Sequence, residues 1–147
     1  MIKKERIRHS IEDLIDNLKY RLMKERDIVF AYILGSYADG CPGPLSDFDI
    51  GIYIEESKEI FEKKLYLNFI ITDILKTDEV DIIILNTASP FFIHHSLKNA
   101  KLLFSKDERT RFSFLVKNMK EYFDMQYYYV RFKESLLKRI REGRYSV

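Results

Sequence analysis

The residues best suited to chemistry lie in one stretch between Gly35 and Asp49, which is rich in glycine, serine and aspartate. Asp47 and Asp49 are two residues apart in an extended run, so we expect their side chains to point the same way, roughly 7 Å apart. Two carboxylates in that arrangement repel each other unless a cation lies between them. Oxygen ligands in a small open cluster suit magnesium, whose coordination shell keeps several waters and includes phosphate oxygens of the substrate. The pair therefore predicts a magnesium site.

The start of the same stretch predicts a phosphate site. A β-branched and aromatic run at 27–34 indicates a buried strand that ends at Gly35. Gly35 would let backbone N–H groups approach an anion, and Ser36 is suited to cap a short helix whose first turn is electropositive. We therefore expect a nucleoside triphosphate between this turn and the metal ions.

A third carboxylate comes from the next predicted strand. Asp81 opens the apolar run 82–85, and an aspartate in such a place is costly to bury without a partner. We expect Asp81 to join Asp47 and Asp49. In this interpretation the first two acids hold the ions that grip the triphosphate. Asp81 helps to hold the second ion and draws the proton from an attacking hydroxyl, in a two-metal in-line displacement that releases pyrophosphate.

The combined pattern resembles a known family. Gly35-Ser36, ten further residues, the Asp-Phe-Asp triplet at 47–49 and then Asp81 on an apolar strand resemble the DNA polymerase beta-like nucleotidyltransferase superfamily. The motif core covers 29–86. Length and the missing acceptor domain make the chain most similar to the minimal nucleotidyltransferases, the MNT-type antitoxins that are paired with HEPN-domain ribonuclease toxins.

This resemblance implies an α/β (α+β) fold, with a small mixed β-sheet flanked by helices. It implies an enzyme that uses two Mg²⁺ ions to transfer AMP from ATP to a tyrosine hydroxyl of a partner HEPN toxin, with which it forms a hetero-oligomer. The catalytic and metal-binding residues would be Asp47, Asp49 and Asp81, and the nucleotide would be bound at Gly35 and Ser36.

Two alternatives stay open. The chain could be a non-catalytic antitoxin that neutralises its partner by docking, which is favoured by Asp39, because family members often carry an arginine there. It could instead be a nucleotidyltransferase that acts on a small molecule or an RNA 3′ end. Against this alternative, 147 residues leave no separate acceptor-binding domain.

Length and composition predict one domain over residues 1–147, because 46% hydrophobic residues suffice for a core. The first residues do not read as a signal peptide, and no apolar run approaches the roughly 20 residues of a membrane span. The single cysteine, Cys41, can form no internal disulfide. We therefore expect a cytoplasmic protein without a membrane segment.

The remaining elements are predicted from periodicity and capping residues. The wide apolar arc of one helix suggests that it is well covered and crosses between the two acid-bearing strands. The helices and the edge strand are expected at 4–26, at 57–76 with Ser57 as cap, from Ser89-Pro90 to Lys98, and at 100–105 for the strand.

A long final helix is predicted at about 107–142, opened by a capping box at Ser105. Its first half is expected to pack on the rest of the domain, whereas its second half looks like a surface for docking a partner. The alternative is that this half folds back on the first helix. From Lys98 onward, thirteen basic residues face six acidic ones. Because tyrosines on an amphipathic helix are more often packing residues, we do not expect direct binding to nucleic acid.

Overall fold

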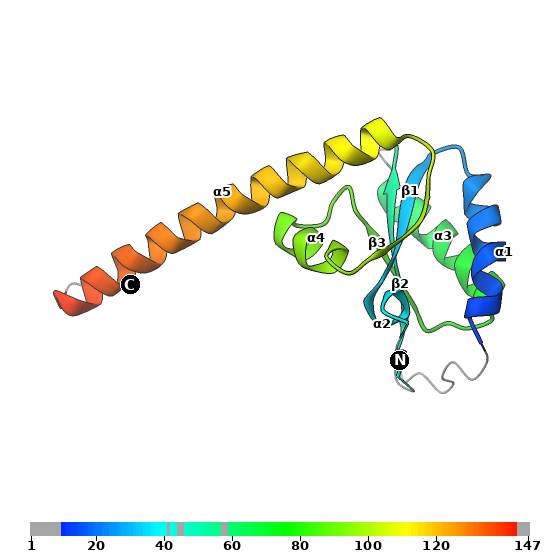
Figure 1. The fold of residues 1–147 in the computed structure, drawn as a ribbon, viewed down its shortest axis with the longest axis horizontal. Coiled ribbons are helices and arrows are strands. Elements are labelled where there is room, and N and C mark those ends of the chain that lie inside the picture. Colours follow the sequence, from blue (N-terminus) through cyan, green and yellow to red (C-terminus); the bar gives the residue numbers. More distant parts are fainter. Residues whose placement is uncertain (1–9, 41, 44–45, 57–58, 144–147) are drawn as a thin grey trace.

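The structure is a computed structural model that describes residues 10–40, 42–43, 46–56 and 59–143. The described residues form four strands and five helices, which alternate along much of the chain (Figure 1). In chain order they are α1 Glu12–Met23, β1 Ile28–Leu34, α2 Gly35–Ala38, β2 Phe48–Ile54, α3 Ile60–Leu75, β3 Val80–Ile84, α4 Pro90–Leu97, β4 Lys101–Ser105 and α5 Glu108–Arg141.

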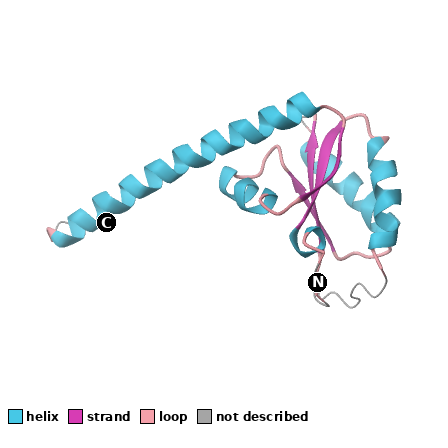
Figure 2. Cartoon of the chain, viewed as in Figure 1, coloured by secondary structure: helices cyan, strands magenta, loops and turns pink. Residues whose placement is uncertain are grey.

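The four strands form one mixed sheet in the order β3-β2-β1-β4. In Figure 2 the strands, in magenta, lie between the helices of the body. β1 is antiparallel to both β2 and β4, while β2 and β3 are parallel. A parallel pair needs a crossover, and α3 supplies it between the two strands that carry the acids. The predicted fold class, the crossover helix and the position of β4 at an edge of the sheet are confirmed.

Strand alternation divides the sheet into two different faces. Four side chains of β2 on one face are 0% exposed, and they pack with Ile82 and Ile84 of β3 against α1 and α3. The residues between them lie on the other face, where the ring of Tyr53 stacks on Phe30, 4.8 Å between centroids, and contacts Phe114 of α5. In Figure 1, α1 and α3 lie on one side of the sheet, and α4 and α5 on the other. The four buried residues of β2 are Phe48, Ile50, Ile52 and Ile54.

Several predicted helix boundaries are wrong. The first helix begins at Glu12, with Ser10 and Ile11 before it, and ends at Met23 rather than at residue 26. Its predicted part at 4–9 and the predicted cap Ser57 lie outside the described residues. The prediction that α3 is well covered is also wrong, because Phe61 and Phe69 are each 73% exposed. The apolar arc of α3 is wider than the surface that the sheet and α1 offer to it.

The two later caps had different outcomes. The hydroxyl of Ser89 accepts a hydrogen bond from the N–H of Phe92 at 3.1 Å, so the predicted cap of α4 is confirmed. The predicted capping box at Ser105 is wrong. Ser105 stays in β4, where it pairs with Phe30 of β1, and the carboxylate of Asp107 caps α5 instead.

The long final helix is confirmed, and it projects from the body. With 34 residues it is about 51 Å long. Its first part packs on α4 and β1, but every described residue from Phe123 to Gly143 is exposed. The helix extends away from α1, so the alternative of folding back is wrong (Figure 1). Among the described helices, none has the length and apolar character needed to cross a membrane.

Candidate active site

Two of the three predicted acids are neighbours across the sheet. Asp49 of β2 and Asp81 of β3 are register partners in the parallel pair, and Asp49 also pairs with Leu34 at the end of β1. Adjacent strands are about 4.8 Å apart, so both aspartates start from adjacent points on the sheet. Asp49 is half-buried and Asp81 is exposed, so both can be reached from solvent.

The turn after β1 lies directly against Asp49. Gly35 has a φ of +66°, and a Cβ atom at this position would lie 2.6 Å from Oδ2 of Asp49. A larger residue would therefore be strained and would displace the carboxylate. The predicted cap is wrong in detail, because α2 begins at Gly35 itself with Leu34 as its N-cap residue and no capping bond from a side chain. Ser36 lies inside the helix because the left-handed turn at Gly35 starts it one residue earlier.

A cavity of about 260 Å³ joins the turn to the two aspartates. It lies on the α4 side of the sheet and brings three predicted site residues, Gly35, Asp49 and Asp81, to one place. Its described lining residues are Leu34, Gly35, Asp39, Asp49, Asp81, Ile83, Phe92, His95, Ser96 and Asn99.

Asp47 is placed differently from the other two acids. It precedes β2, is exposed, and is not among the described residues that line this cavity. Burial, followed by the charges of Glu79, Glu12 and Asp47, raises the pKa of the Tyr37 phenol. The negative charge of Asp47 therefore affects a residue of α2. Among the described residues, no three His, Cys, Asp or Glu side chains stand together as a ready metal site. The metal-binding roles of Asp47, Asp49 and Asp81 stay predictions.

The donor chemistry nevertheless fits magnesium. Asp49 and Asp81 offer carboxylate oxygens, which Mg²⁺ prefers, and an ion that keeps several waters needs few protein ligands.

The family described as "Polymerase beta, Nucleotidyltransferase" matches residues 16–109, well over half of the chain, and this match includes the turn and all three acids. The chain belongs to the polymerase beta nucleotidyltransferase family. The predicted enzyme class, a nucleotidyltransferase, is thereby confirmed.

Solved structures similar to this nucleotidyltransferase come from toxin–antitoxin complexes. A chain from the complex of the tri-AMPylated Shewanella oneidensis HEPN toxin with its MNT antitoxin is 18% identical, with a TM-score of 0.66 over 87% of this chain and 99% of that chain. A chain from a toxin–antitoxin complex with AMP-PNP is 21% identical, with a TM-score of 0.66 over 86% and 98%. A MntA–HepT complex gives 17% identity, a TM-score of 0.64, and 86% and 98% coverage. At these identities the likeness establishes the fold. No curated protein matches the sequence.

The nucleotidyltransferase cavity also has a wall that sequence reasoning missed. His95, Ser96 and Asn99 come from the end of α4 and the turn after it. The sequence predicted a helix there, and α4 confirms it. The position of these three residues over the acids was not predicted. The connection after β3 leaves the end of the strand that is far from the acids, and α4 then returns the chain towards them, a direction that no local pattern in the sequence indicated.

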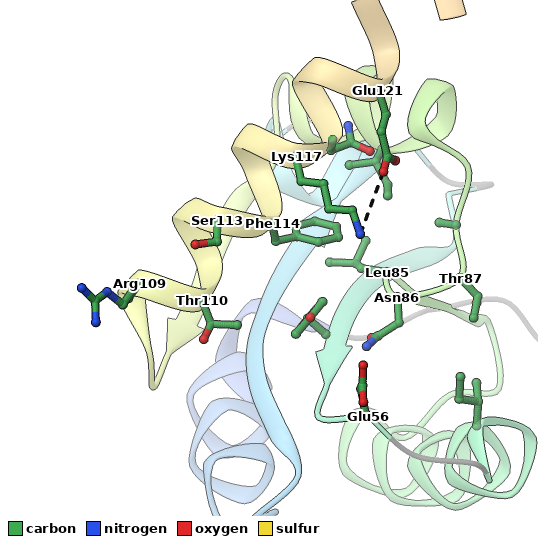
Figure 3. A pocket seen from close by; sticks show the side chains of 15 residues that line it. Glu56, Leu85, Asn86, Thr87, Arg109, Thr110, Ser113, Phe114, Lys117 and Glu121 are labelled. Carbon is green, nitrogen blue, oxygen red and sulfur yellow. Dashed lines mark ion pairs between the residues drawn. The ribbon is translucent and has the colours of Figure 1, made fainter. Parts of the chain in front are cut away.

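A larger cavity of about 850 Å³ lies at the other end of the strands, under α5 (Figure 3). Its described lining contains none of the predicted site residues, and much of its polar rim is paired. The amide of Asn86 bonds both the N–H and the C=O of Ile54, at 3.0 and 2.6 Å, and Lys117 lies 4.0 Å from Glu121. Figure 3 shows Arg109 pointing away from the cavity. The smaller cavity is therefore the better candidate for the chemistry of the nucleotidyltransferase.

Proposed function

We propose that this nucleotidyltransferase is an antitoxin that transfers AMP from Mg-ATP to a tyrosine hydroxyl of a partner HEPN toxin. The observation that carries the proposal is the pairing of Asp49 with Asp81 beside Gly35 in one open cavity. The similar solved structures support the choice of acceptor, since one of them contains a tri-AMPylated HEPN toxin with its MNT antitoxin.

The reaction proposed for this site is an in-line displacement at the α-phosphorus of ATP. The tyrosine oxygen forms a bond to that phosphorus while the bond to the β-phosphate oxygen breaks, so pyrophosphate leaves. Asp81 accepts the proton of the phenol, and Asp47 and Asp49 are the further ligands that we assign to the ions. Bound Mg²⁺ would neutralise charge on the phosphates and on the attacking oxygen.

The size of the cavity suits the reacting part of the nucleotide. Small-molecule sites usually measure about 300–1,000 Å³, and this one measures about 260 Å³. It therefore fits the phosphates and their ions, with the nucleoside extending towards solvent. The turn at Gly35 brings backbone N–H groups close to the phosphates without a side chain in the way.

The second half of α5 is the surface that we propose for docking the partner. Exposed apolar side chains recur there every seven residues, at Phe123, Val130 and Leu137, which is the spacing of a seam between packed helices. Residues 131–141 carry five basic side chains and one acidic side chain. That charge opposes side-by-side pairing with a second copy, so it favours a helical partner with acidic flanks.

The test is label transfer from [α-³²P]ATP and Mg²⁺, with the protein encoded by the adjacent gene as the acceptor. We expect wild type to label a tyrosine of that protein. Asp49→Asn and Asp81→Asn should each lower the rate by at least about a hundredfold with no loss of melting temperature. Asp73→Asn makes the same chemical change on the exposed face of α3 and should label normally.

Asp39 favours a second candidate function, a purely docking antitoxin. The carboxylate of Asp39 lines the cavity together with those of Asp49 and Asp81, and no Lys or Arg lies among its described lining residues. If no label moves and Asp49→Asn still protects cells from the toxin, then docking alone is the function. Label on an added aminoglycoside or on an RNA 3′ end, with none on the protein, would instead identify a different acceptor.

A further inference from the structure

We propose that His95 binds the two phosphates of ATP that leave as pyrophosphate, a role that rests on the proposed function. His95 lies on α4 and lines the same cavity as Gly35, Asp49 and Asp81. His95 would contact the nucleotide directly, in addition to the three acids and the turn.

The charge balance of the cavity calls for such a group. Its described lining contains three carboxylates, those of Asp39, Asp49 and Asp81, and neither lysine nor arginine. A triphosphate that enters this site needs hydrogen-bond donors as well as metal ions, because its own charge adds to that of the carboxylates. The imidazole of His95 carries a ring N–H at neutral pH whether or not it is protonated, so it can donate to a phosphate oxygen.

The ring of His95 is held in place by aromatic neighbours. Its centroid lies 4.3 Å from that of Phe91 on the preceding turn, 5.3 Å from that of His94 and 5.9 Å from that of Tyr122 on α5. Contacts of this kind restrict the ring before the ligand arrives, which lowers the entropy cost of binding. Ser96 and Asn99 add a hydroxyl and an amide to the same wall.

The position on α4 determines which phosphates we assign to His95. The α-phosphate has to lie at Asp49 and Asp81, where the displacement takes place. His95 lies on a different wall of the cavity from the two acids, so we assign its ring N–H to the β- and γ-phosphates. A donor there would stabilise the charge that develops on the leaving pyrophosphate.

The experiment compares the binding of AMP-PNP and of AMP to the full-length protein with Mg²⁺, by calorimetry. His95→Ala should weaken AMP-PNP binding about tenfold and leave AMP binding unchanged. His95→Gln keeps an N–H donor and should recover most of the loss. The matched control is Leu97→Ala, which loosens the packing of α4 at a residue that does not appear in the described lining of the cavity.

The outcomes separate this inference from the function on which it rests. If wild type binds AMP-PNP and transfers label but His95→Ala binds AMP-PNP as well as wild type, the role of His95 is wrong and the function stands. Equal losses in Leu97→Ala and His95→Ala would also overturn the role, because they would point to a general effect on α4. If wild type binds no AMP-PNP, both proposals fail.

Discussion

The two faces of the sheet differ by a single residue step along β2. Phe48, Ile50 and Ile52 are fully buried against α1 and α3, whereas Asp49, one position along, opens into a cavity. Both faces use the same strands and the same hydrogen bonds. The comparison shows how alternation in a strand lets one sequence segment build a sealed core and a reactive site back to back.

Only one face of the sheet is sealed, because the helices cover the two faces to different extents. α1 and α3 lie along the sheet and close the first face, and at its rim Lys63 pairs with Glu25 at 3.1 Å and with Asp27 at 2.7 Å. On the second face α4 has only 8 residues, and α5 leaves the body after its first turns. At the beginnings of β2 and β3 a cavity therefore stays open between the turn at Gly35 and the end of α4, which is where a nucleotide would have to enter.

The largest effect on stability is expected on the sealed face. Ile52→Ala removes a fully buried side chain and should lower the free energy of unfolding by about 2–5 kcal/mol. Leu65→Ala, on the exposed side of α3, should change it by less than about 0.5 kcal/mol. Urea unfolding measures both. Below the melting temperature, Ile52→Ala should transfer label at the wild-type rate per folded molecule, and a much lower rate would contradict the separation of the two faces.

The second prediction uses two glycines with similar backbones and different surroundings. Gly35 and Gly40 have φ values of +66° and +73°, so an alanine at either position should cost about 1–2 kcal/mol. A Cβ at Gly35 would meet Asp49 at 2.6 Å, whereas no atom of the described residues lies within 4 Å of a Cβ at Gly40. Label transfer should therefore fall at least about tenfold in Gly35→Ala alone. Equal rates in the two variants would show that Asp49 tolerates displacement.

The pairing of Asp49 and Asp81 could be predicted because it depends on local rules. Alternation placed Phe48 and Asp49 on opposite faces, and an apolar helix between two strands indicated a parallel neighbour. Strand alternation does not fix the side chain of Asp47, because this residue lies before the first residue of β2, and its role stays a prediction. The position of His95 could not be predicted, because it results from the packing of α4 against Tyr122, about which the sequence near α4 carries no signal.

The residues at which helices begin also depend on contacts that are distant in sequence. Ser105 and Asp107 are both chemically able to cap α5, and strand pairing decides between them because Ser105 is needed in β4. At the start of α2, the left-handed turn of Gly35 overrides the preference of Ser36 for the cap position. Local propensity proposes several start points, and contacts distant in sequence select one of them.

A smaller effect is expected at the rim of the sealed face. Burial alone would raise the pKa of Glu25, but hydrogen bonds from Arg21, Lys63 and Tyr66 outweigh it and hold this pKa below its ordinary value of 4.5. The ionised form is therefore favoured by folding. Its contribution is present above pH 4.5 and is lost as the pH falls through the lower pKa of the folded state.

Glu25→Gln should thus cost about 1 kcal/mol at pH 7 and flatten the decline in stability below pH 4.5. Glu62→Gln, at an exposed position of α3, serves as the control and should keep the wild-type decline. Urea unfolding at pH 7 and at pH 3 measures the difference. An unchanged pH profile in Glu25→Gln would mean that the ion pairs at this rim do not stabilise the sealed face.

The smallest effect on the fold is expected beyond both faces, on the projecting part of α5. Val130 is 47% exposed and lies in the stretch where every described side chain is open to solvent, so Val130→Ser should leave the free energy of unfolding within about 0.5 kcal/mol of wild type. The same variant should weaken the complex with the acceptor protein, measured by size-exclusion chromatography with light scattering, because it interrupts the seven-residue apolar seam. A marked loss of stability in the isolated protein would instead show that this half of α5 packs on its own body in solution, and the docking surface would then lie elsewhere.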